Sequence, residues 1–359
     1  MLLGAGASLG YDETLQDLRR PPRTNEVLAK AYKIGVFTRN TFPNLYDKVM
    51  AHLVKQTNQA ISEPTGILDV EEFLGGLADQ FAAAVLAQSQ LFSQQNPSTE
   101  EIKKLSEETH SLQAALGETW YLLFDTLRTY SIAYVANFDA YQRLALAYLR
   151  EPYSVISLNY DTIFEMAILN AGLSLNYFPP NPPRSIPIAK VHGSIGWLNP
   201  LARTVVNPSI KRPDVLKFVA PLIYSNRFNM GPPQILDPRT LATIGLSDLL
   251  RSGSDYDEPL LIPPIGNNKD YDKATLYQKV WQLAAGMIGQ SSELVLVGTT
   301  LRRQDVKLCD TIANNLNKGT KIVAVRGVKE VTETLNAILP WKPDAIETFD
   351  SFEKYAKTL

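Results

Sequence analysis

Short apolar runs alternate with amphipathic stretches in the second half of the chain. The runs are rich in Val, Ile and Leu and cover residues 154–158, 186–191, 260–262, 293–297 and 321–325. An apolar run of about five residues is typical of a parallel strand buried on both faces, and the helical spacing between runs indicates crossover helices. A similar run opens the chain, where Met1-Leu2-Leu3 leads into Gly4-Ala5-Gly6-Ala7-Ser8. The pattern predicts an α/β fold built on a doubly wound, mostly parallel, Rossmann-like sheet.

Residues 43–150 follow helical periodicity almost throughout. Asp69 is placed to cap a helix that continues through Leu86, and further helices are predicted over 100–134 and 138–149. A connector rich in Gln and Ser is predicted over 88–99. We therefore expect a large helical insertion in a Rossmann-like domain.

The insertion implies a three-part division of the chain. Residues 1–42 supply the first strand, turn and helix, residues 43–150 form the insertion, and residues 151–359 complete the domain. Six prolines between residues 204 and 257 indicate an irregular module at about 200–258. Arg20 and Arg23 flank two prolines near the glycine turn, where they could clamp a pyrophosphate or remain solvated.

Composition narrows the function classes. The formal net charge is −2 and the 35 basic residues are scattered, so we expect no direct nucleic-acid binding. The apolar runs are shorter than the roughly 18 residues of a membrane span, and Met1-Leu2-Leu3 lacks the features of a signal peptide, so no membrane association and a cytoplasmic location are expected. The single cysteine, Cys309, allows no disulfide or cysteine-based zinc site and is expected to be a small buried side chain; no metal is expected.

Polar turns follow three of the predicted strands. They are Asn159-Tyr160-Asp161, His192-Gly193-Ser194 and Gly298-Thr299-Thr300. Ligands of open α/β sheets bind at the carboxyl ends of strands, so these turns are candidate site segments. His192 could equally be a packed or capping histidine, whereas His52 and His110 lie among polar helical residues and are expected at the surface.

The glycine turn at the start of the chain is a candidate phosphate site. Glycines before a helix let backbone N–H groups approach a phosphate closely. The spacing is not Gly-x-Gly-x-x-Gly, because Leu9 occupies the third glycine position, and no clear strand ending in a ribose-binding acid follows. A plain turn between strand and helix is an equally good interpretation of this segment alone.

Taken in order, the four turns resemble those of the sirtuin superfamily. The closer resemblance, over residues 1–20 and about 150–330, is to the sirtuin-like branch of bacterial antiphage defence systems. The resemblance implies that NAD⁺ is bound. It implies phosphate or adenosine contacts for Gly4, Ala5, Gly6, Ser8, Gly298 and Thr299, and a catalytic site at the nicotinamide ribose made by Asn159, Asp161 and His192, with His192 as the base.

These side chains suit cleavage of the bond between ribose and nicotinamide. An asparagine amide both donates and accepts, so Asn159 could orient a ribose hydroxyl and a water together. A histidine with a pKa of about 6.5 can take a proton at neutral pH. Asp161 could align the site or bind the nicotinamide amide.

The single cysteine departs from the sirtuins that deacylate proteins, which carry a four-cysteine zinc module. We therefore expect an NAD⁺ glycohydrolase that releases nicotinamide and ADP-ribose and depletes NAD⁺ in an abortive antiphage response. The alternatives are an NAD-dependent deacylase or ADP-ribosyltransferase, and a non-catalytic scaffold that binds NAD or ADP-ribose. The resemblance further implies a homo-oligomer and an activating partner, such as a DNA-translocating ATPase, an Argonaute-like protein or a phage component.

Overall fold

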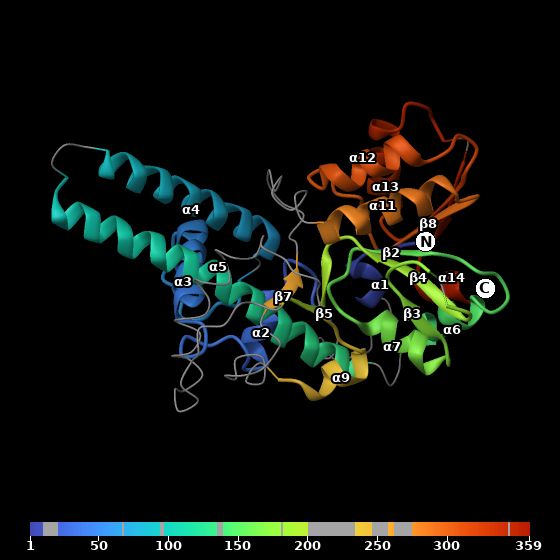
Figure 1. Ribbon diagram of the computed structural model, residues 1–359, viewed down its shortest axis with the longest axis horizontal. Coiled ribbons are helices and arrows are strands. Elements are labelled where there is room, and N and C mark those ends of the chain that lie inside the picture. Colours follow the sequence, from blue (N-terminus) through green and yellow to red (C-terminus); the bar gives the residue numbers. More distant parts are fainter. Residues whose placement is uncertain are drawn as a thin grey trace.

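In the computed structural model, a parallel sheet forms the core of the domain in the right half of Figure 1. The structure describes residues 1–9, 21–66, 68–93, 97–134, 139–180, 182–199, 234–245, 258–261, 275–343 and 345–359. Within these residues seven strands pair in the order β10-β9-β8-β1-β2-β4-β3, all parallel. The strands are β1 (Leu2–Leu3), β2 (Val155–Ser157), β3 (Ser174–Asn176), β4 (Ser185–Lys190), β8 (Glu293–Val297), β9 (Lys321–Val325) and β10 (Ile346–Phe349).

The strand β1 lies at the middle of this sheet and decides where a ligand can bind. Leu2 is in register with Ile156 of β2 on one side and with Leu296 of β8 on the other. The strands β2, β4 and β3 lie on one side of β1, whereas β8, β9 and β10 lie on its other side. Such a change of direction opens a crevice at the carboxyl ends of the strands.

Two groups of helices flank the sheet, which confirms the predicted α/β Rossmann-like fold. One group contains α11 (Thr275–Gly289), α12 (Val306–Asn315) and α13 (Val328–Ile338), and the other contains α6 (Asp139–Ala147), α7 (Ile163–Asn170) and α14 (Phe352–Ala356). The short helix α1 (Ala5–Leu9) follows β1 directly. The apolar faces of these helices and the strands form one core cluster, because the central strands are buried by helices that the chain supplies on either side.

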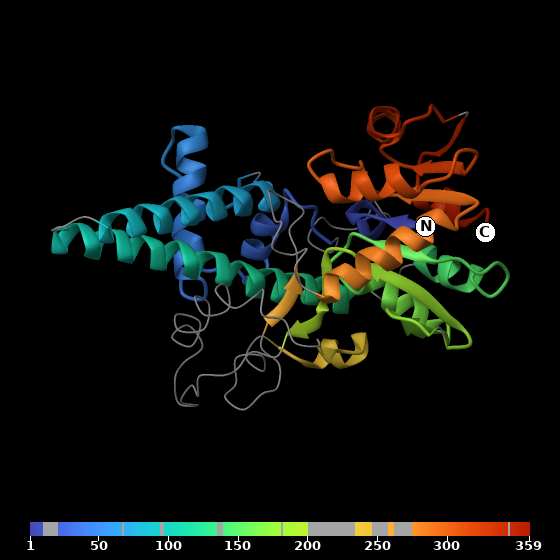
Figure 2. The same cartoon turned by 45° about the horizontal axis from the view of Figure 1, so that its top comes forward.

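A long helical hairpin extends from the side of this domain. The helices α4 (Val70–Phe92) and α5 (Thr99–Tyr134) lie side by side in both views, and α3 (Pro43–Thr57) packs against α5 (Figures 1 and 2). With α2 (Val27–Lys33) they build a second core. The predicted connector over 88–99 is wrong in its first part, because α4 continues to Phe92; glutamine is a good helix former and does not end a helix.

A small antiparallel sheet joins the hairpin to the domain. In the described part of the chain it contains β5 (Gly193–Asn199), β6 (Gln234–Ile235) and β7 (Glu258–Leu261). The helix α9 (Pro238–Thr243) lies between β6 and β7 in the chain. Trp120 of α5 donates through Nε1 to the carbonyl oxygen of Leu261 at 3.1 Å. The predicted strand at 260–262 therefore pairs with β5 and not with the parallel sheet.

Several predictions fall on residues outside the described ranges. These are the loop with Arg20 and most of the irregular module at about 200–258. Among the described residues, no helix is both long and apolar enough to cross a membrane.

Candidate functional site

A cavity of about 430 Å³ opens at the carboxyl ends of the parallel strands. Its volume is in the range of small-molecule sites. All four predicted turns contribute to the lining, through Gly4, Ala5, Gly6, Asn159, Asp161, His192, Gly298 and Thr299. The helical part adds Glu71 of α4 and Leu123 and Leu127 of α5. The structure thus brings together every predicted site residue except Ser8, which is not part of the lining.

The glycines of the first turn pack against the turn that follows β8. The N–H of Gly6 donates to the carbonyl oxygen of Gly298 at 2.8 Å, and Gly4 donates to Val297 at 2.9 Å. A Cβ on Gly298, which has a φ of +62°, would lie 2.0 Å from the nitrogen of Ala7. Close contact between the two turns therefore accounts for glycine at these positions. The chemistry of a ligand phosphate adds no further requirement there.

Ser8 lies beneath the cavity, where its hydroxyl joins three side chains. Its Oγ lies 3.0 Å from Oδ2 of Asp161, 3.0 Å from Nδ2 of Asn159 and 3.1 Å from the hydroxyl of Tyr141. An ionised carboxylate only accepts, so Ser8 donates to Asp161 and accepts from Asn159. Ser8 is 1% exposed. The structure gives it a supporting position under Asn159 and Asp161, in contrast to the phosphate contact that the resemblance implies.

Asn159 presents a buried oxygen with no partner. Because its Nδ2 is used by Ser8, its amide orientation is set and Oδ1 is left over. Among the described residues this oxygen has no hydrogen-bond donor, although it is buried. An unsatisfied buried acceptor costs about 1–3 kcal/mol. A hydroxyl group of a ligand in the cavity could relieve this cost.

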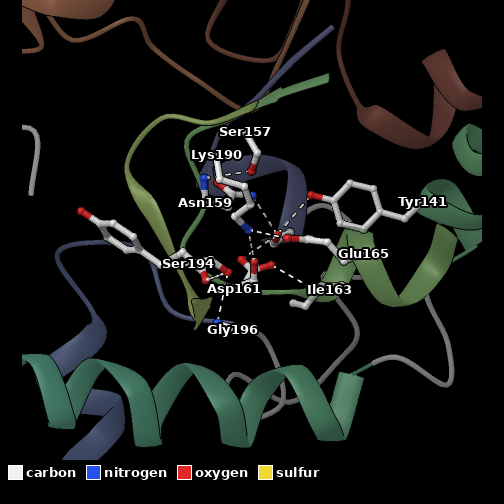
Figure 3. A network of polar contacts seen from close by, with 11 residues as sticks. Tyr141, Ser157, Asn159, Asp161, Ile163, Glu165, Lys190, Ser194 and Gly196 are labelled. Atoms are coloured by element: carbon white, nitrogen blue, oxygen red, sulfur yellow. Dashed lines mark hydrogen bonds and ion pairs between the residues drawn. The ribbon is translucent and has the colours of Figure 1, made fainter. Parts of the chain in front are cut away.

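The loop that carries Asn159 and Asp161 is held by surrounding polar groups (Figure 3). Oδ1 of Asp161 accepts from the N–H of Ile163 at 3.0 Å, at the start of α7. Lys190, which is fully buried, donates from Nζ to the carbonyl oxygen of Asp161 at 2.5 Å and to Oε1 of Glu165 at 2.7 Å. Burial raises the pKa of Asp161 above its ordinary value, while Lys190 and the hydrogen bonds act in the opposite direction.

His192 lies in the turn between β4 and β5 and faces Asp305. Its Nε2 is 2.9 Å from Oδ2 of Asp305, so the two side chains form an ion pair when the imidazole is protonated. Burial lowers the pKa of His192, but Asp305, Glu71 and the carbonyl of Leu158 together raise it above the ordinary value. The imidazole is therefore protonated to higher pH than the value of about 6.5 expected from the sequence.

Asp305 is a site residue that sequence reasoning missed. Its Oδ1 accepts from the N–H of Leu308 at 3.2 Å and so caps the start of α12, while Oδ2 faces His192. An Asp before an apolar helical stretch is a recognisable capping signal. The capping signal does not reveal that His192 faces Asp305.

Glu71 and Arg302 form a second polar cluster in the cavity wall that the sequence did not indicate. Arg302 lies 3.0 Å from Oε2 of Glu71 and 3.0 Å from Oδ2 of Asp69, and it donates to Oγ1 of Thr24 at 2.8 Å. This cluster joins the start of α4 to the segment that follows β8. Burial raises the pKa of Glu71 to about 7.

Two further arginines line the cavity without an ionic partner. The side chains of Arg23 and Arg326 make no hydrogen bond or ion pair with the described residues. Arg23 is exposed, whereas Arg326 is half-buried. Both can attract an anionic ligand.

The remaining candidates lie away from this chemistry. His110 is exposed, and the half-exposed ring of His52 meets the ring of Phe73 edge-on at 5.3 Å. Cys309 is buried in α12 as predicted, and burial raises the pKa of its thiol to about 11. Within the described ranges, no three His, Cys, Asp or Glu side chains are grouped to hold a metal ion.

No known family model and no curated protein matches the chain. The fold and the cavity define it as an α/β protein with a Rossmann-like sheet and a ligand-sized site at the strand ends.

Proposed function

We propose that the protein binds NAD⁺ in this cavity and hydrolyses the bond between nicotinamide and ribose. The observation that carries the proposal is the meeting of all four turns around one cavity, with the unpartnered Oδ1 of Asn159 in its wall. The four turns are far apart in the sequence, and a common ligand would explain why they meet around one cavity.

The position of β1 supports dinucleotide binding. In open α/β sheets a dinucleotide crosses the crevice at the point where the strand order changes direction, with its pyrophosphate at the central turn. Here that turn is Gly4-Ala5-Gly6. Arg23 lines the cavity without an ionic partner among the described residues, which supports a ligand that carries phosphate groups.

In the reaction, water attacks C1′ of the nicotinamide ribose. The bond from C1′ to the pyridinium nitrogen breaks, its electron pair neutralises nicotinamide, and the water loses a proton. The transition state is cationic at the ribose, so the site has to orient groups more than supply a strong acid. Oδ1 of Asn159 accepts from a ribose hydroxyl or from the water, and Ser8 and Asp161 hold the amide in that orientation.

His192 takes the proton of the water at Nδ1 when its imidazole is neutral, once the water replaces the carbonyl of Leu158 as the partner of this nitrogen. Asp305 lies 2.9 Å from Nε2 and stabilises the imidazolium that forms. Because the pKa of His192 is raised, the neutral fraction grows as the pH rises through that raised pKa. Hydrolysis should therefore increase with pH over this range. Glu71, with a pKa of about 7, is a second group in the wall that can exchange a proton near neutrality.

The test is product analysis of NAD⁺ incubated with purified protein over a series of protein concentrations, which also reports whether self-association is needed. We expect nicotinamide and ADP-ribose from the wild type and at least 100-fold less from Asn159→Ala and His192→Ala. His110→Ala is the matched control, because His110 is exposed and outside the cavity. NAD⁺ binding without any product at every concentration would contradict hydrolysis and favour the scaffold. Acyl-peptide turnover, or label on protein in place of free ADP-ribose, would favour the transferase reactions.

The defence role, the homo-oligomer and the activating partner stay predictions. The series of protein concentrations tests the homo-oligomer.

A further inference from the structure

Arg326 occupies a distinctive place beside the cavity. It is the first residue after β9, and β9 pairs with β8 through Val297 and Val325. Its backbone N–H donates to the carbonyl of Phe349 at 3.0 Å, and its φ of +64° is in the left-handed region. Few residues other than glycine adopt this conformation, and strain of this kind is often found where a side chain serves a ligand.

The turn that carries Arg326 is packed against the turn that follows β8. A Cβ on Gly327 would lie 3.4 Å from the carbonyl oxygen of Thr299 and 3.5 Å from Cγ2 of Thr300. Arg326 and Gly327 both line the cavity together with Gly298, Thr299 and Thr300. The ends of β8 and β9 therefore form one wall.

This wall lies opposite the reacting groups. Asn159 and His192 follow β2 and β4, on one side of β1, whereas Arg326 follows β9 on the other side. A dinucleotide whose pyrophosphate lies at the turn after β1 puts one nucleoside on each side. With nicotinamide riboside at Asn159 and His192, the adenosine half lies against the ends of β8 and β9.

Arg326 has no ionic partner within the part of the chain that the structure describes. The cavity carboxylates have partners, since Glu71 is paired with Arg302, Asp305 with His192, and Asp161 accepts from Ser8 and Ile163. Arg326 has none among the described residues. Oε2 of Glu330 lies 4.0 Å from the Cβ position of Gly327, and Glu330 is not in the lining.

Nucleotide-binding sheets distinguish the two dinucleotides by the residue at a strand end beside the adenosine ribose. An acidic side chain binds the free 2′-hydroxyl, whereas an arginine accommodates a 2′-phosphate. An arginine fits such a phosphomonoester well, because its planar fork donates two parallel hydrogen bonds.

We infer that the preferred substrate carries a phosphate on the 2′-oxygen of its adenosine ribose, as NADP⁺ does, and that Arg326 binds this phosphate. The inference rests on the proposed function, since it places the adenosine half by the reaction at the other end of the cavity. It deepens that function by naming the class of dinucleotide.

The experiment compares the binding of ADP-ribose and 2′-phospho-ADP-ribose by calorimetry, because these probes have already lost nicotinamide and are not turned over. We expect the wild type to bind the 2′-phosphorylated probe about 10- to 100-fold more tightly. Arg326→Asn should bring this ratio close to one, because the 2′-phosphorylated probe loses far more affinity than ADP-ribose does, and asparagine tolerates the left-handed backbone. Arg326→Lys should retain part of the preference. Arg303→Asn is the matched control, because Arg303 is exposed and outside the lining.

Adenosine 2′,5′-bisphosphate and adenosine 3′,5′-bisphosphate form the second arm. We expect the 2′,5′ isomer to bind more tightly, and equal binding of both isomers would overturn the inference. A wild-type ratio of one, or an equal loss of both ADP-ribose probes in Arg326→Asn, would also overturn it. If one of these results is found but ADP-ribose binds and NAD⁺ is cleaved, only the inference about the 2′-phosphate fails and the proposed function stands. If no probe binds and no dinucleotide is cleaved, both proposals fail.

Discussion

Replacement of Lys190 by methionine tests the idea that a buried ion pair supports the site. In the wild type, Nζ of Lys190 contacts Oε1 of Glu165 at 2.7 Å and the carbonyl oxygen of Asp161 at 2.5 Å. Both ionic side chains are almost completely buried, at 0% and 3% exposed. Methionine fills a similar volume but supplies no donor. The substitution therefore leaves a buried carboxylate and a backbone carbonyl without partners.

The expected cost is large. Removal of one member of a buried ion pair destabilises a protein by about 3–5 kcal/mol, and an unpaired carbonyl adds part of a further ~1–3 kcal/mol. Typical domains are stable by only about 5–15 kcal/mol. The double variant Lys190→Met with Glu165→Met should recover most of the ion-pair part and keep the cost of the Asp161 carbonyl, so we expect it to remain about 1–3 kcal/mol below the wild type.

Urea unfolding followed by circular dichroism at pH 5 and pH 7.5 measures these differences. Burial raises the pKa of Glu165, and Lys190 lowers it, so loss of Lys190 raises it further. A carboxyl with a raised pKa binds more protons in the folded state, so the single variant should lose stability as the pH rises from 5 to 7.5. The reasoning is refuted if Lys190→Met costs less than about 1 kcal/mol at pH 7.5, or if the double variant is no more stable than the single one.

Three further substitutions test other contacts. Gly298→Ala should lower the free energy of unfolding by more than about 2 kcal/mol, because its Cβ would meet backbone at 2.0 Å. Gly319→Ala is the control: its φ is +91°, but its Cβ would lie in open space, so it should cost only about 1 kcal/mol. Equal losses of stability in thermal unfolding would contradict this. Burial raises the pKa of Glu118 from 4.5 to about 7, so unfolding free energy should fall by ~3 kcal/mol between those pH values, and Glu118→Gln should abolish this slope in urea titrations. Asp305→Asn should lower the pKa of His192 in an NMR titration, because burial then meets less opposing negative charge; an unchanged pKa would rule out the role given to Asp305.

The parallel strands were predictable because their residues are buried on both faces. The runs at 293–297 and 321–325 coincide with β8 and β9, since such burial leaves a continuous apolar segment in the sequence. The strands that the sequence did not predict lack this signal. β10 is an edge strand with exposed residues, and β5 contains two glycines and follows β4 after only two residues.

The sequence by itself determined the fold class and the residue types in the four turns. Only the tertiary structure decided which side chains act together. Asp305 beside His192, Lys190 under Asp161, and Arg302 across Glu71 are pairs formed between distant segments. The physical reason is that strand periodicity depends on neighbours along the chain, whereas side-chain pairing depends on the order of strands in the sheet and on how the helical part packs against their ends.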